Sequence, residues 1–128
     1  MGNWNVYALP GNPIAGDVSW TDYPAVSLSK DELFITGNLL AYGGSWQTSF
    51  KQSVIWQIDK ENGFNGDSTI TTQLWSDIIV KNTAIRNLHP VRGGAELYGP
   101  NMFFLSNKNF AIQSDLIYLL EVTGTISD

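Results

Sequence analysis

Apolar and polar residues alternate along short segments of this chain, and these segments recur in the same order twice. An apolar segment at residues 33–36 closes with a polar turn, and an alternating segment follows at residues 53–59. The same order returns at residues 101–107 and 114–121. Alternation with a period of two is typical of β-strands with one buried face. The repeat therefore predicts two similar groups of strands, each packed against a neighbour.

The segments between these landmarks predict further strands and one long loop. Residues 4–9 alternate and stop at a Pro/Gly/Asn cluster, so they form a short first strand. Residues 25–29 alternate and are joined to residues 33–36 by a charged turn, which predicts a hairpin. Another strand is expected at residues 69–74, and residues 41–52 are expected to form a long surface loop that could carry binding groups.

In chain order these segments give one lone strand, a group of four and a group of three. This order predicts an all-β protein of antiparallel β-propeller-type blades. Residues 1–21 would supply the outer strand of a neighbouring blade plus a loop, residues 22–81 the first blade, and residues 82–128 a second, incomplete blade. The alternative is a two-sheet β-sandwich, because short apolar runs fit either arrangement.

Composition agrees with one all-β module and excludes several partners. The chain has 128 residues, 43% of them hydrophobic and 15% charged, which suits a single domain of many short strands. A net charge of −5 with only seven Lys and Arg leaves no basic surface for nucleic acid. No apolar run approaches the ~18–20 residues of a membrane span, and no signal peptide precedes the first strand, so no membrane insertion is expected.

Polar residues with catalytic or metal-binding chemistry are few, and no cofactor or metal is expected. With no Cys in the chain, His89 is the one imidazole or thiol available, and its place before Pro90 suits a turn or packing. The acidic segment at residues 59–67 lacks the spacing of a calcium loop and favours an Asx-turn. Arg86 and Arg92 bracket His89 and could hold an anion, or could simply be solvated.

Aromatic residues fall into two groups with different expected roles. Those within strands are expected in the core between sheets: Trp56, Trp75, Phe103 and Phe104. Aromatics beside Gly, Asn, Asp and Ser suit stacking on a sugar ring, and the alternative is that they seal contacts between blades. With one arginine, the candidate ligand-binding residues are Trp20, Tyr23, Tyr42, Trp46, Tyr98 and Arg92.

Four segments of the chain resemble repeats in large, mostly uncharacterised, propeller-like proteins exported by bacteria. They are Asp22-Tyr23-Pro24, residues 33–38, residues 53–60 and residues 98–106. The resemblance spans nearly the whole chain and implies the fold and an extracellular or cell-surface location, but it carries over no catalytic residue. The chain departs from that pattern because it has about two blades and no export signal.

Two blades cannot close a ring, so something must cover their outer faces. Three copies would give about six blades and four copies about eight, within the usual ~4–8; alternatively, the remainder of a longer chain covers them. The sequence therefore predicts a non-catalytic binding or scaffolding module that recognises a glycan or a protein partner. The alternatives are a structural fragment or a glycoside-active enzyme with Asp17, Asp22 or Asp67 as acid or base.

Overall fold

The chain folds into antiparallel β-sheets with one short helix. The computed structural model describes residues 2, 4–93, 95–107 and 112–128. Within that part the elements are β1 (Ser19–Leu28), β2 (Glu32–Ala41), β3 (Phe50–Asp59), α1 (Lys60–Asn65), β4 (Thr72–Trp75), β5 (Ile79–Val80), β6 (Thr83–Ala84), β7 (Arg86–Pro90), β8 (Met102–Asn107) and β9 (Ile117–Val122). The predicted all-β, antiparallel character is confirmed.

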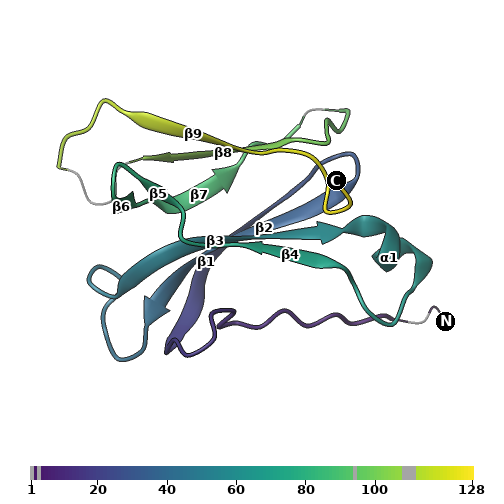
Figure 1. Cartoon of the computed structure of the whole chain (residues 1–128), viewed down its shortest axis with the longest axis horizontal. Coiled ribbons are helices and arrows are strands. Elements are labelled where there is room, and N and C mark those ends of the chain that lie inside the picture. The colour runs from purple at the N-terminus through teal and green to yellow at the C-terminus, as the bar shows by residue number, and fades with distance from the viewer. Residues whose placement is uncertain (1, 3, 94, 108–111) are drawn as a thin grey trace.

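Two larger sheets face each other, as Figure 1 shows. One is a meander in the order β1-β2-β3-β4, the other a meander in the order β7-β8-β9, and the small β5-β6 hairpin links them. The predicted grouping of four and three strands is confirmed, as is the first hairpin, where Leu28 pairs with Leu33. The part of the chain that the structure describes forms no closed propeller.

The predicted first strand is wrong, because residues 4–9 belong to no sheet. The segment instead runs along the outer face of the four-stranded sheet (Figure 1). Leu9 and Ile14 pack there against an apolar cluster made by β2, β3 and β4. The Tyr7 hydroxyl donates to the carbonyl of Asp67 at 2.7 Å, and Thr21 Oγ1 donates to the carbonyl of Gly11 at 2.8 Å. Side-chain contacts, and not backbone hydrogen bonds to a strand, hold this segment. Its alternating pattern therefore reflects packing of every second side chain on the face of the sheet.

A short helix occupies part of the region expected to be a turn. Its N-cap is Asp59, whose side chain accepts a hydrogen bond from the Glu61 amide at 2.8 Å, and it ends at Gly66 with a φ of 72°. The sequence favoured an Asx-turn within residues 59–67, and the Asx-type contact of Asp59 begins a short helix there. Gly66 suits the left-handed conformation that ends it.

The main core lies between the two large sheets. Alternate residues of β8 point inward, so that Phe104 meets Phe34 of β2 edge-on, with ring centroids 5.9 Å apart. Ile55, Ile85 and Leu88 complete the centre of this cluster. Burial of side chains of this size contributes ~1.5–3 kcal/mol each, so this layer holds the sheets together.

Polar side chains also cross the interface between the sheets, along strand β7. As the edge strand of its sheet, β7 has one side without a neighbouring strand. Four residues of the facing sheet bond to the backbone at this strand: Ser27 to the Val91 carbonyl (3.1 Å), Thr36 to the Leu88 carbonyl (2.7 Å), Ser53 to the Ile85 carbonyl (2.8 Å) and Asn38 to the Asn87 amide (3.0 Å). We call these four residues the inter-sheet polar seam.

The expected core aromatics divide in two. Trp56 and Phe104 are buried, as predicted. Trp75 and Phe103 are each 40% exposed, so the prediction that they lie in the core is wrong for these two. Phe103 alternates with two inward residues of β8 and therefore points outward. Trp75 ends β4 at the sheet edge, where its indole donates to Gln57 Oε1 at 2.9 Å.

Replacing Asn38 by alanine should destabilise the fold by about 2 kcal/mol, because two donors lose their acceptor. Asn38 Oδ1 accepts from the Ser53 hydroxyl at 3.0 Å as well as from the Asn87 amide, and the residue is buried. The free energy of unfolding from urea titration measures the effect. Asn65→Ala is the matched control at an exposed position, and equal effects of the two changes would contradict a structural role of the seam.

Candidate functional site

The six predicted ligand-binding residues do not meet in one place. Trp20, Tyr42 and Trp46 lie where β2 leaves the four-stranded sheet, because Trp20 pairs with Leu40 and the other two follow in the β2–β3 loop. Arg92 and Tyr98 lie in the β7–β8 connection at the opposite end of that sheet (Figure 1). Tyr23 lies between these ends, at an irregularity in the β1–β2 pairing.

Trp46 acts as a cover over a buried arginine. The Arg86 guanidinium lies 5.7 Å from the Trp46 ring centroid and 5.1 Å from that of Phe50, and Arg86 is 5% exposed. Burial lowers the pKa of Arg86, and the charge of Asp22 partly opposes this shift. Arg86 is the first residue of β7 and Arg92 follows its other end, so they do not form the anion site considered from the sequence. Trp46 thus has a packing role of the kind expected for a sealing aromatic.

Tyr23 joins the two sheets at their outer margin. Its hydroxyl lies 3.3 Å from His89 Nε2, and the two rings meet edge-on with centroids 5.7 Å apart. Tyr23 and Asn87 both have positive φ, at 52° and 57°, at irregularities of β1 and β7. This contact gives His89 the packing role that its place before Pro90 suggested.

A cavity of about 430 Å³ brings Arg92 and Tyr98 together. Its walls are mainly apolar, with Leu28, Met102 and Phe103 among them. An apolar cleft with a few polar groups at its rim is typical of small-ligand sites. Here the rim offers a cationic guanidinium and a phenol, which suit a sugar or an acidic group.

The backbone of the β7–β8 connection is tied down on both sides of this cavity. The Lys30 amide donates to the Tyr98 carbonyl at 2.7 Å, and the Val91 amide donates to the Phe103 carbonyl at 2.8 Å. Asn101 accepts from the Gly124 amide at 3.0 Å and donates to Glu121 at 2.6 Å. The cavity is therefore anchored to the β1–β2 turn and to β9.

The outward side of the β7-β8-β9 sheet carries an apolar strip that meets this cavity at Phe103. Phe103 and Leu105 of β8 are 40% and 43% exposed, and Ile117 and Leu119 of β9 are 74% and 64% exposed. Leu105 pairs with Leu119, so the strip is continuous across two strands. We call these four residues the outer apolar face. The sequence could have indicated this face, because the apolar run of β8 is uninterrupted, and such a run is typical of a strand covered on both sides.

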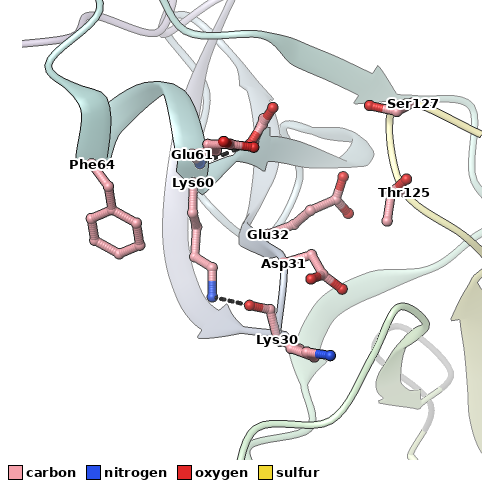
Figure 2. Close-up of a pocket in the computed structure, with 9 residues that line it drawn as sticks. Lys30, Asp31, Glu32, Lys60, Glu61, Phe64, Thr125 and Ser127 are labelled. Atoms are coloured by element: carbon pink, nitrogen blue, oxygen red, sulfur yellow. Dashed lines mark hydrogen bonds between the residues drawn. The ribbon is translucent and has the colours of Figure 1, made fainter.

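A second cavity, of about 370 Å³, is lined by four acidic residues and two lysines (Figure 2). Two of the acids, Glu32 and Asp59, bond to groups of the protein itself. Glu32 is buried and accepts from the Ile126 amide at 2.7 Å and from Gln57. Asp59 caps α1, and Lys60 donates to the Ser29 and Lys30 carbonyls at 2.6 and 2.8 Å. In the described residues no group of three or more His, Asp or Glu side chains is arranged to hold a metal.

Two of the acids considered for glycoside chemistry, Asp17 and Asp67, lie far apart. Asp17 lies next to the start of β1 and forms an ion pair with Lys51. Asp67 follows α1, and its carboxylate accepts from Asn62 at 2.9 Å. These positions lie near opposite ends of the ten-residue β2, about 30 Å apart at strand spacing, whereas glycosidase pairs lie within ~5–10 Å. Asp17 and Asp67 therefore cannot act as a pair.

No helix in the described ranges is both long and apolar enough to pass through a bilayer.

Replacing Lys51 by methionine should raise the pKa of the Asp17 carboxyl. Hydrogen bonds from Lys51 and then Ser19 lower this pKa in the wild type. The ion pair therefore stabilises the fold above the ordinary carboxyl pKa of ~3.9, and this contribution disappears as the pH falls through the folded-state pKa. A carbon-13 NMR titration of the carboxyl group measures the shift. Lys81→Met is the control, and an unchanged Asp17 pKa in Lys51→Met would contradict the pairing.

Comparison with known proteins gives no relative from which a function could be transferred. No protein-family model, no characterised protein and no solved structure matches the chain. Its function must therefore be argued from its own surfaces.

Proposed function

We propose that this chain is a non-catalytic scaffolding module that associates with protein modules of its own kind through the outer apolar face. The observation that carries the proposal is the side of β8 and β9 turned away from the core, where Leu105 and Leu119 pair and both are exposed. An uninterrupted apolar run such as that of β8 is typical of a strand that is covered on both faces. The inner face is covered by the four-stranded sheet, and the outer face is left for a partner.

The size of the outer apolar face supports an interaction role. At their observed exposures its four side chains present on the order of 400 Å² of apolar surface, which is comparable with the largest patch on an ordinary monomer, ~300–600 Å². Such patches often mark interaction sites. Covering this one at ~25 cal/mol per Å² would contribute about 10 kcal/mol before the entropy cost of association.

A propeller-type arrangement is the form of assembly that we propose. Two successive propeller blades would be two meander sheets packed face to face, and the outer face of the second blade would be exposed. The β1-β2-β3-β4 and β7-β8-β9 sheets have this arrangement. A ring would then need several copies, with about six to eight blades from three or four chains, or further blades from a longer chain.

Replacing Leu119 by glutamate should abolish self-association without unfolding the chain, because it puts a charge in the centre of the strip and leaves the core untouched. Light scattering after size exclusion, over a dilution series, gives the mass. We expect a mass that rises with concentration for the wild type and stays at one chain for the variant. Val18→Glu is the control, since Val18 is also well exposed but lies outside this face. Unchanged association of Leu119→Glu would contradict the proposal.

Glycan binding at the Arg92 and Tyr98 cavity is the second candidate function, since this cavity unites two of the predicted ligand-binding residues. Tyr98 is well exposed and could stack on a sugar ring. Tyr98→Ala should lower binding to a glycan array about tenfold, the loss expected for about 1.4 kcal/mol of stacking. Tyr42→Ala, at the other end of the sheet, is the control. A wild-type chain that binds no glycan, or equal binding by both variants, would rule this function out.

A further inference from the structure

A second exposed apolar surface lies on the opposite side of the molecule. Trp4 and Val6 are 92% and 88% exposed, and Phe64 of α1 is 84% exposed. Apolar side chains this large are seldom left so open in groups. Phe64 lines a cavity with Tyr7 and Leu9, whereas Trp4 and Val6 lie on the other side of the N-terminal segment. We call Trp4 and Val6 the N-terminal apolar surface.

The way residues 4–9 are held explains why this surface points outward. Tyr7 and Leu9 line one cavity with Phe64, against β2 and β3 of the four-stranded sheet. Successive side chains of an extended segment point to opposite sides, so Trp4 and Val6 face away from the sheet that Tyr7 and Leu9 contact. The bond from the Tyr7 hydroxyl to the Asp67 carbonyl fixes the segment beside the end of α1.

The two apolar surfaces are separated by the full thickness of the molecule. Residues 4–9 lie on the outer side of the four-stranded sheet, and the outer apolar face lies on the outer side of β7-β8-β9 (Figure 1). Both large sheets and the main core lie between them. Each copy therefore has an apolar surface on each of two opposite sides.

We infer that the N-terminal apolar surface of one copy packs on the outer apolar face of the next copy, giving head-to-tail association. The inference rests on the proposed scaffolding function and names the partner surface. The two surfaces match in size, because Trp4 and Val6 present on the order of 350 Å² against about 400 Å² on the outer apolar face. With a polar rim around them, this approaches the ~800 Å² per partner of a standard interface.

A symmetric dimer would cover less of the exposed apolar surface than head-to-tail packing. Pairing the outer apolar face with itself would leave Trp4 and Val6 in water on both copies, whereas head-to-tail packing covers both kinds of surface in every internal copy. A heterologous contact also repeats, and it closes into a ring when the rotation between copies allows. This is the geometry that a multi-copy ring of blades requires.

Mixing two complementary variants tests the arrangement. The first variant, Trp4→Glu with Val6→Glu, lacks the N-terminal apolar surface, and the second, Leu119→Glu, lacks the outer apolar face. Each alone keeps only one working surface and should stay at the mass of one chain. An equimolar mixture has one intact pair of surfaces, so its mass should double to two chains and should rise no further with concentration. The wild type should form larger assemblies under the same conditions.

The other outcomes separate the two proposals. If the first variant associates like the wild type while Leu119→Glu does not, head-to-tail packing is wrong and the scaffolding function stands. The same conclusion follows if both variants are monomeric and their mixture is too. If Leu119→Glu associates like the wild type, or the wild type is monomeric at every concentration, both proposals are wrong. Circular dichroism checks that each variant is folded, and Ile117→Lys replaces Leu119→Glu if that variant unfolds.

Discussion

The inter-sheet polar seam is the constraint on which the rest of the structure depends. An edge strand laid on the face of another sheet would bury carbonyl and amide groups without partners, at ~1–3 kcal/mol each. Thr36, Asn38 and Ser53 provide those partners along β7, between the apolar contacts of Phe34 and Ile55 on the same face. The seam thereby specifies one placement of β7, where apolar packing alone would tolerate several.

Once β7 is placed, the surfaces that carry the proposed functions follow. The β7–β8 connection must return along the β1–β2 turn, where the Tyr98 carbonyl is held by Lys30, and this return creates the Arg92 and Tyr98 cavity. Strand β8 then puts Phe104 into the core and Leu105 on the outside. The strand pairing that builds the core therefore also builds the outer apolar face, so substitutions along β8 affect the core and this face together.

The N-terminal segment, on the other side of the molecule, also has one side that packs on a sheet and one that is exposed. It covers the apolar outer face of the four-stranded sheet with Leu9 and Ile14, and the alternation that does so turns Trp4 and Val6 outward. A three-layer arrangement results, in which the covering layer is not a strand but an extended chain held by side chains. Trp4 and Val6 are exposed on its far side, and this is why the molecule has exposed apolar side chains on two sides rather than one.

The sequence by itself determined the all-β class, the first hairpin and the grouping of four and three strands, because alternation and turn residues act over a few neighbours. It also suggested Arg92 and Tyr98 as candidate binding residues. It did not show that these two line one cavity while Trp46 lies at the far end of the sheet over Arg86. Tertiary structure alone decided that residues 4–9 cover a face instead of extending a sheet. It also decided that Phe103 points to solvent, because the partner of an apolar side is set by contacts distant in the chain, which local pattern does not encode.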